Sequence, residues 1–235
     1  TAQPIDGDAK GTGQTGAGAL VAVLGQHGIT ATPTSSLSAT RAAIDDPSAT
    51  TLFVYDPSGY LDSGQLSDLS GLAAKVVMLS PGKAQLRAID RNITLIGTST
   101  SSPGAHCALP AARKAGTIAD AAHAYRVSSG VKGYARCFPS GDNDYSLVQR
   151  ATARSTFTVV GDTNAFTNRY ISDSGNAALA INLLGSEPNL VWDRPSIEDV
   201  GTGGETETPA EAAPAWFLPL SVLVLLVIIA AAIWR

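Results

Sequence analysis

Three polar side chains that could bind a ligand or assist catalysis each follow an apolar run. These side chains are Asp56, Ser80 and Asp162, and the runs before them are TLFVY, KVVML and TFTVV. Because the carboxyl ends of parallel strands meet at one edge of an α/β sheet, the three residues form a candidate ligand-binding crevice. An Asp or Ser in a turn also bonds to its own main chain, so local capping is the alternative for each.

The residue patterns that nucleophilic catalysis needs are missing from the sequence. An α/β hydrolase carries G-x-S-x-G after a strand, and a glutamine amidotransferase carries a cysteine on a sharp strand-to-helix turn with a histidine partner. The first motif is absent, Cys107 and Cys137 lie in an irregular region, and His27, His106 and His123 are scattered. We therefore expect no catalytic residue, no metal site and no cofactor, and we expect that the protein is not an enzyme.

A Gly-x-Gly-x-x-Gly motif at residues 11–16 precedes a predicted helix. A dinucleotide site would also need a strand directly before the motif and an acid about twenty residues later. Residues 1–10 are polar without a strand pattern, and Thr and Pro occupy the region of the acid. We interpret the motif as a flexible entry to the helix, whose free N–H groups could still hold an anion.

The hydrophobic pattern predicts the α/β class, with a flavodoxin-like, mostly parallel sheet and helices on both faces. Strands are predicted at residues 29–32, 51–55, 75–79, 93–96, 145–152 and 156–160, with a last edge strand at 190–192. Helices are predicted at 17–26, 36–44, 62–72 and 175–184, with an N-cap at Ser36 and a capping box of Asp62 and Gln65. Residues 98–150 break this pattern and predict an insertion with a hairpin around residues 128–130.

The C-terminal residues 216–234 form an uncharged apolar run. As a helix this run would span about 30 Å, the thickness of the hydrocarbon core of a bilayer, and Trp216 and Trp234 would lie at the two membrane interfaces. The alternative is a buried core helix. We predict an extracytoplasmic domain over residues 1–195, an acidic Pro/Gly-rich stalk over 196–215 and one transmembrane helix, which places the protein in the cell membrane. Arg235 would lie on the cytoplasmic side.

The net charge of −4 comes from the predicted stalk, because acids and bases balance in residues 1–195. A neutral domain has no bulk charge to attract nucleic acid, so we expect no nucleic-acid partner. The chain has two cysteines, Cys107 and Cys137. Outside the cytoplasm they are expected to form a disulfide that stabilises the fold by about 3 to 4 kcal/mol, and two unrelated buried thiols are the alternative.

The sequence resembles a bacterial family of membrane proteins of unknown function with a glutamine-amidotransferase-like, flavodoxin-like extracytoplasmic domain. The matching segments are GAGALVAVLGQHGI, TLFVYDPSGYLDSGQLSDL, VVMLSPG, the two cysteines and VVGDTNAFTNRYISDSGNAALAINLLG, followed by the apolar C-terminal run. The resemblance implies two membrane helices with the domain between them, and a part in an envelope assembly system linked to a MoxR-type AAA+ ATPase. Because the chain opens with Thr-Ala-Gln-Pro, we expect an upstream signal or first helix.

The function expected from these features is that of a membrane-anchored protein-interaction module. Its expected partners are the lipid bilayer and other membrane or envelope proteins. The rival expectation is a small-ligand-binding protein, or a degenerate amidotransferase-like or hydrolase-like enzyme, that uses the crevice near Asp56, Ser80 and Asp162. A third expected function is that of a purely structural spacer in the envelope.

Overall fold

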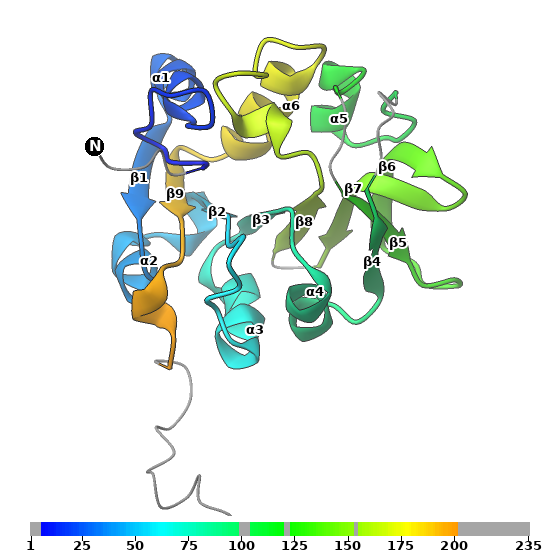
Figure 1. The fold of residues 1–235 in the computed structure, drawn as a ribbon, viewed down its shortest axis with the longest axis horizontal. Helices are drawn as coiled ribbons and strands as arrows, with labels where there is room; N and C mark the ends of the chain where they lie inside the picture. The colour runs from blue at the N-terminus through cyan, green and yellow to red at the C-terminus, as the bar shows by residue number, and fades with distance from the viewer. Residues whose placement is uncertain (1–5, 99–103, 120–122, 153–154, 202–235) are drawn as a thin grey trace, which may run out of the picture. The chain divides into compact units, whose positions relative to one another are not determined.

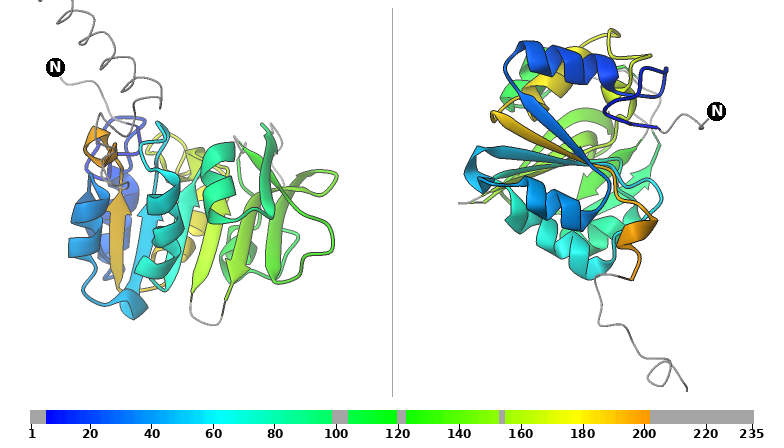
Figure 2. Two further views of the ribbon diagram at one scale, coloured as in Figure 1. Left: turned by 90° about the horizontal axis from the view of Figure 1, so that it is seen from below. Right: turned by 90° about the vertical axis from the view of Figure 1, so that its left-hand side faces the viewer.

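A computed structural model describes residues 6–98, 104–119, 123–152 and 155–201 of the chain. Within these residues one mixed sheet has the strand order β1-β9-β2-β3-β8-β7-β5-β4, and β6 pairs with β7. Helices cover both faces of the sheet (Figures 1 and 2). The structure therefore confirms the α/β class.

The first half of the sheet is parallel. It consists of β1 (Thr30–Thr34), β9 (Asn189–Asp193), β2 (Thr50–Val54), β3 (Lys75–Leu79) and β8 (Thr156–Val160). Every residue of β2 is buried, which fits an apolar, β-branched-rich run that is covered on both faces. The carboxyl ends of these strands lie at one edge of the sheet, where α/β folds bind ligands.

The second half of the sheet is antiparallel, which corrects the predicted mostly parallel sheet. It consists of β7 (Asp144–Ala151), β5 (Ala124–Val127), β4 (Ile93–Gly97) and β6 (Tyr134–Gly141). The tight hairpin joins β6 to β7 through Asn143, whose φ of 63° suits a turn. The hairpin predicted around residues 128–130 is wrong, since β5 and β6 do not pair with each other. The predicted insertion over residues 98–150 thus contributes three strands, β5, β6 and β7, to the sheet itself.

Strand β9 lies between β1 and β2, whereas we predicted an edge strand there. The sequence did contain a signal for the inner position, because three consecutive apolar residues, Leu190, Val191 and Trp192, face both sides of the sheet and all are buried. The order of strands in a sheet does not follow their order in the chain, so this run was misplaced.

The helices form one layer on each face (Figure 2). One layer contains α1 (Gly18–Gln26), α5 (Pro110–Ala115) and α6 (Asn176–Leu184), and the other contains α2 (Leu37–Ala43), α3 (Ser63–Leu72) and α4 (Lys83–Ile89). The Ser36 cap and the capping box of Asp62 and Gln65 are confirmed. Helix α4 was missed, because Pro81-Gly82 before it was interpreted only as the end of a strand. Short 3-10 turns occur at Pro47–Ala49, Asn164–Phe166 and Ile197–Asp199.

The predicted disulfide is confirmed between Cys107 and Cys137, whose Cα atoms are 5.2 Å apart. It joins the segment before α5 to the buried side of β6.

Replacing Cys107 and Cys137 together with alanine is expected to lower the free energy of unfolding by about 3 kcal/mol, because the unfolded chain loses its covalent loop closure. Urea denaturation of the double variant and of the oxidised parent measures this difference. A reducing agent should destabilise the parent to a similar degree and leave the variant unchanged. An identical urea midpoint for parent and variant would contradict this prediction.

The domain extends beyond the predicted boundary at residue 195. Asp199 is 2% exposed, and its Oδ1 accepts a 2.7 Å hydrogen bond from the Leu37 N–H at the start of α2. Asp199, four residues beyond this boundary, is therefore still bonded to the domain. The rest of the predicted stalk and the predicted transmembrane helix over 216–234 lie outside the described residues. Among the described residues, no helix has the length and apolar character that a membrane span requires.

Candidate functional site

A pocket of about 300 Å³ lies at the carboxyl ends of the parallel strands. Four of the five parallel strands contribute to it: Tyr55 follows β2, Leu79 ends β3, Thr163 follows β8, and Trp192 belongs to β9. This is the edge at which α/β sheets bind ligands, and the volume is at the lower end of the range for small-molecule sites. We call it the strand-end pocket.

The floor of the strand-end pocket is apolar and rigid. Trp192 and Phe166 are each 1% exposed, and both rings pack on Phe53 with centroids 4.2 and 5.3 Å away. The Trp192 indole Nε1–H donates a 3.0 Å hydrogen bond to the Gly7 carbonyl, so its only polar atom is already paired. The floor is therefore apolar and closely packed, and its indole offers a ligand no further hydrogen bond.

The rim of the strand-end pocket is polar and carries one charge of each sign, on Asp6 and Arg169. The Arg169 guanidinium lies over the Tyr170 ring, 5.1 Å from its centroid. Burial raises the pKa of the Tyr55 hydroxyl, and the nearby Asp6 carboxylate raises it further. Tyr55 therefore keeps its proton at neutral pH and can donate a hydrogen bond into the pocket.

Residues 11–16, the glycine loop, supply the pocket residues Gln14 and Thr15. No strand precedes the loop within residues 6–10, so the structure lacks the strand that a dinucleotide site would need. Gly16 is required for packing, because a Cβ there would lie 2.3 Å from the Gly11 carbonyl oxygen. The loop thus acts as a fixed pocket wall.

Asn168 fastens the glycine loop to the rest of the domain. Its side-chain amide donates to the carbonyls of Gly11 and Gly13 at 2.9 and 2.7 Å, and its carbonyl accepts from the Ala19 N–H at 2.9 Å. The last bond also satisfies one of the free N–H groups at the start of α1 that we expected to be available for an anion. Sequence reasoning missed Asn168, and no local pattern marks it.

Replacing Asn168 with alanine is expected to destabilise the domain by about 2 kcal/mol, because three hydrogen bonds are lost, one of which, to the Gly11 carbonyl, is partly buried. The glycine loop should also loosen, which faster amide hydrogen exchange at residues 11–16 would reveal. The matched control is Asn182→Ala on α6, whose Nδ2 bonds to its own helix at Ala178. Equal exchange of the loop in both variants would contradict the role given to Asn168.

The sequence-predicted residues Asp56, Ser80 and Asp162 follow β2, β3 and β8 at this edge of the sheet, and none of them lines the strand-end pocket. The Asp56 carboxylate accepts hydrogen bonds from the main-chain N–H groups of Tyr60 and Leu61, at 2.9 and 3.1 Å. These contacts correspond to the alternative of local capping. The positions beside the three residues, at 55, 79 and 163, face the pocket instead.

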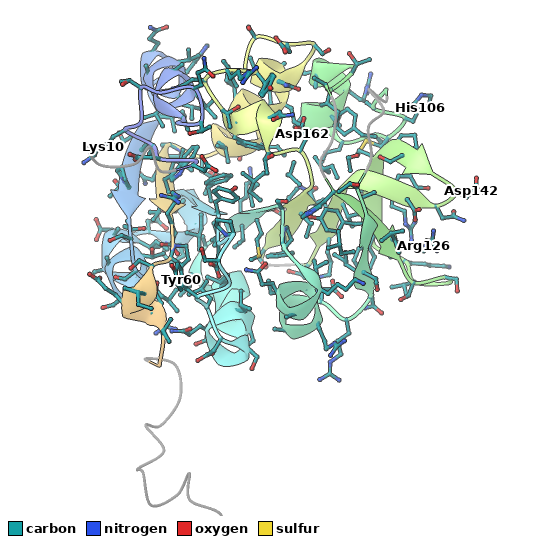
Figure 3. All side chains as sticks on the ribbon, viewed as in Figure 1. Lys10, Tyr60, His106, Arg126, Asp142 and Asp162 are labelled. Carbon is teal, nitrogen blue, oxygen red and sulfur yellow. A yellow bond between two sulfur atoms is a disulfide. The ribbon has the colours of Figure 1, made fainter. Side chains whose placement is uncertain are left out.

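Asp162 lies in the loop after β8 and is 0% exposed (Figure 3). Its Oδ1 accepts hydrogen bonds from the N–H groups of Asn164 and Ala165, at 2.9 and 3.3 Å. Asp162 therefore shapes the turn that presents Thr163 and Asn164 to the pocket.

Ser80 and His123 form a contact that the sequence did not predict. The Ser80 Oγ lies 2.7 Å from His123 Nδ1, and Ser80 has a φ of 51° on the sharp turn between β3 and α4. Burial lowers the pKa of His123, so its ring is neutral at pH 7. A serine on a strained strand-to-helix turn beside a neutral histidine has the geometry of an activated nucleophile.

The same turn lacks free main-chain donors for an oxyanion. The Ser80 N–H donates to the Val160 carbonyl at 2.7 Å, and the Gly82 N–H donates to the Gln85 side chain at 2.8 Å. Pro81, the residue after the serine, has no N–H at all. Acyl transfer draws much of its rate from such donors, and the residue after the nucleophile normally supplies one. The turn therefore favours binding or structure over acyl chemistry.

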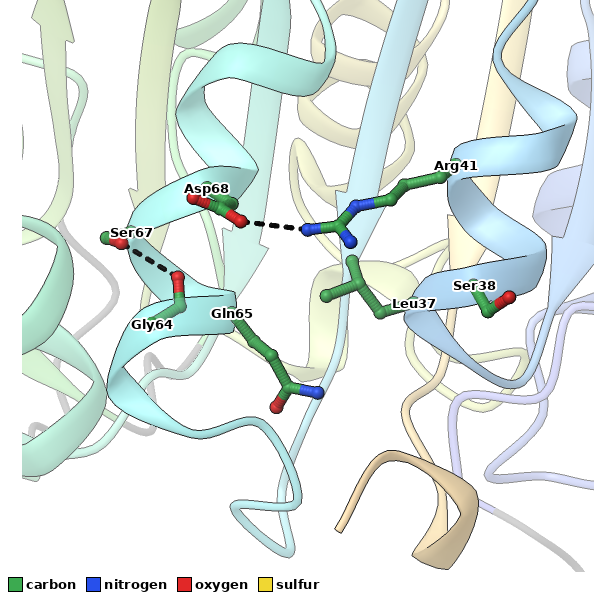
Figure 4. A pocket seen from close by; sticks show the side chains of 7 residues that line it. All are labelled: Leu37, Ser38, Arg41, Gly64, Gln65, Ser67 and Asp68. Carbon is green, nitrogen blue, oxygen red and sulfur yellow. Dashed lines mark hydrogen bonds and ion pairs between the residues drawn. The ribbon is translucent and has the colours of Figure 1, made fainter. Parts of the chain in front are cut away.

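Two further observations bear on alternative sites. A second hollow of about 420 Å³ lies between α2 and α3, and the 2.9 Å ion pair of Arg41 and Asp68 spans it (Figure 4). These two side chains are 49% and 60% exposed, no aromatic ring lines the hollow, and no strand ends there, so it is the weaker candidate. Among the described residues, no cluster of three or more His, Cys, Asp or Glu side chains could hold a metal ion.

Comparison with known proteins identifies relatives by sequence. Residues 9–184 match the family described as "Domain of unknown function (DUF4350)". The chain is 28% identical over 184 residues to the uncharacterized membrane protein Rv3691 of Mycobacterium tuberculosis, an alignment that covers 78% of this chain. The aligned part spans 46% of the length of that relative. The solved mmIFT52 N-terminal domain is similar with a TM-score of 0.39 and 10% identity, covering 60% of this chain and 76% of its own.

Proposed function

The chain belongs to the DUF4350 family, and we propose that its α/β domain binds a small ligand non-covalently in the strand-end pocket. The observation that carries this proposal is the position of the pocket, where four parallel strands end over an apolar floor. The proposal favours the ligand-binding alternative over a purely structural spacer, because a spacer has no need of a preformed pocket.

The lining of the strand-end pocket indicates the class of ligand. Tyr55 and Tyr170 offer aromatic rings, and Asn164 and Gln14 offer amide groups. Aromatic faces bind flat apolar surfaces, while amides and hydroxyls fix orientation through hydrogen bonds. We propose a compact ligand with one flat apolar face and an edge of hydroxyl or amide groups, about the size of a monosaccharide or a nucleoside.

We also propose that the domain catalyses no reaction. The turn at Ser80 resembles the strand-to-helix turn on which an amidotransferase-like domain carries its nucleophile. We propose that it is a degenerate form of that turn, in which serine replaces cysteine and Pro81 removes the usual oxyanion donor. Its contact with His123 then orders the loop that leads into β5.

An alkyl fluorophosphonate is accordingly expected not to label Ser80, because covalent attack on phosphorus also requires a stabilised oxyanion. Intact-mass measurement after incubation tests this, with a known serine hydrolase in the same tube as the positive control. Labelling that disappears in Ser80→Ala would contradict the proposal and support the hydrolase-like alternative.

We further propose that the domain faces an extracytoplasmic compartment and is anchored in the membrane by residues 216–234. The disulfide of Cys107 and Cys137 supports the first point, because such bonds persist in oxidising compartments. The uncharged run and the name of the mycobacterial relative, a membrane protein, support the second.

The fluorescence of Trp192 tests ligand binding directly. The chain has three tryptophans, so replacing Trp216 and Trp234 with phenylalanine leaves only the one in the pocket floor. Titration with a panel of monosaccharides, nucleosides and amino acids should shift or quench the emission for at least one class. Thr163→Phe, which fills the pocket without adding a tryptophan, should abolish the response. A response that persists in Thr163→Phe, or none from any class, would overturn the proposal.

A further inference from the structure

A groove lined by three cations lies beside strand β4, away from the strand-end pocket. Lys83 and Arg87 of α4 and Arg91 after it form one wall, and residues 93–95 of β4 form the other. The groove has a volume of about 370 Å³. We call it the basic groove. Among the described residues, no carboxylate belongs to its lining.

The three cations of the basic groove make no ion pair and no side-chain hydrogen bond with any described residue. Asp90, the nearest acid in sequence, is 4% exposed and already engaged. Its Oδ2 contacts the Arg150 guanidinium at 2.9 Å and accepts a 2.7 Å hydrogen bond from the Tyr134 hydroxyl. Since residues 1–195 carry no net charge, the groove is a local excess of positive charge that the fold itself does not neutralise.

Strand β4 is an edge strand. It pairs with β5 on one side and stands at the end of the sheet order, with no other described strand beside it. An unpaired edge presents main-chain N–H and C=O groups that can pair with another chain. Ile96 on this strand is 42% exposed, one of few large apolar side chains so exposed among the described residues. Both features mark β4 as a surface suited to strand addition.

The spacing of the cations fits an extended peptide. Lys83 and Arg87 are one helical turn apart, which is about 6 Å along the helix axis. Alternate side chains on one face of a strand are about 6.8 Å apart, nearly the same repeat. A peptide paired with the edge of β4 could therefore present an acidic side chain to each cation at every second position.

We propose that β4 and the basic groove bind an extended acidic segment of a partner protein by strand addition. Main-chain hydrogen bonds to the edge of β4 supply affinity, and carboxylates on alternate residues pair with Lys83, Arg87 and Arg91 and supply specificity. This interaction is separate from the strand-end pocket, so either can fail without the other.

The test uses the full chain in detergent and a fluorescent nine-residue peptide of alternating Glu and Thr. Fluorescence anisotropy should show binding that weakens as salt rises from 50 to 200 mM. The triple variant K83E/R87E/R91E should lose at least tenfold in affinity and should instead bind the matching Lys–Thr peptide. The control variant R113E/K132E reverses exposed cations elsewhere and should bind like the parent.

Four results would overturn the proposal. The first is equal loss of affinity in R113E/K132E, which would indicate nonspecific charge attraction. The second is undiminished binding of a peptide N-methylated on either edge, which would exclude strand addition. The third is cation-dependent binding to phosphatidylglycerol vesicles that the peptide does not compete with, which would indicate a lipid surface. The fourth is a tenfold gain in peptide affinity in E205Q/E207Q/E211Q, which would indicate that the chain's own acidic segment occupies the groove.

Discussion

Replacing Asp193 with asparagine is expected to stabilise the domain by about 4 kcal/mol at pH 8 and to leave its stability at pH 4 nearly unchanged. Asp193 ends β9 and is 0% exposed. The pKa of its carboxyl is raised from 3.8 to about 7, mainly by burial. The charges of Asp199 and Asp56 also contribute to this rise, and hydrogen bonds from Thr40 and Thr34 partly oppose it. Its Oδ2 has no hydrogen-bond partner among the residues that the structure describes.

Asp193→Asn stabilises the folded chain at high pH because the Asp193 carboxyl has a higher pKa in the folded chain than in the unfolded chain. Below pH 3.8 the carboxyl is protonated in both folded and unfolded chains, so burial carries no ionisation penalty. Between pH 4 and 7 the unfolded chain ionises while the folded chain holds its proton, and stability falls as the pH rises through the folded pKa of about 7. Asparagine cannot ionise, so this loss disappears.

Urea denaturation of parent and Asp193→Asn at pH 4, 6 and 8 measures the difference directly. His123 works in the opposite direction, because its lowered pKa costs stability as the pH falls, but it is present in both proteins and cancels. Asp173→Asn, at an exposed position before α6, is the matched control and should show the pH dependence of the parent. A constant difference between parent and Asp193→Asn across this pH range would contradict the account.

Replacing Gly161 with alanine is expected to destabilise the domain by more than about 4 kcal/mol, enough to unfold much of the protein at 37 °C. A Cβ at Gly161 would lie 1.9 Å from the carbonyl oxygen of His123, a contact with main chain that no side-chain rotation can relieve. Because the two segments approach so closely, the His123 N–H donates a 3.1 Å hydrogen bond to the Gly161 carbonyl. It therefore also positions His123 against Ser80.

Gly71→Ala is the matched control for this substitution. Gly71 lies in α3 with nothing within 4 Å of the added Cβ, so alanine should stabilise the helix by about 0.5 to 1 kcal/mol. Thermal unfolding of both variants and the parent makes the comparison. Unfolding of Gly161→Ala at the temperature of the parent would contradict the close contact between Gly161 and the His123 carbonyl. It would also contradict the position given to His123 beside Ser80.

Much of the scaffold could be predicted from the sequence because local signals set it. The run KVVML predicted β3 with its bounds, and the capping box of Asp62 and Gln65 predicted the start of α3. Strand order could not be predicted in this way, because it depends on which buried runs pack together. For that reason β9 was misplaced at the edge and β4 was expected among parallel strands.

The sequence predicted the edge of the sheet at which the strand-end pocket lies, but not the residues that line this pocket. Strand ends at Asp56, Ser80 and Asp162 indicated the correct edge of the sheet, but the alternation of a strand turns adjacent side chains to opposite sides. The pocket is lined by the residues next to them, while Asp56 and Asp162 accept hydrogen bonds within their own turns. The contacts of Asn168 with the glycine loop and of Ser80 with His123 join residues far apart in the chain, and only the fold reveals such pairs.

Crystallographic fragment screening of the compact unit Thr1–Gly203 tests the central claim, that the strand-end pocket is a ligand site, most directly. We expect fragments with one flat apolar face to collect in the strand-end pocket, with that face against Trp192 and polar groups toward Asn164 and Gln14. Fragments that leave this pocket empty and gather instead in the hollow between α2 and α3 would contradict the claim.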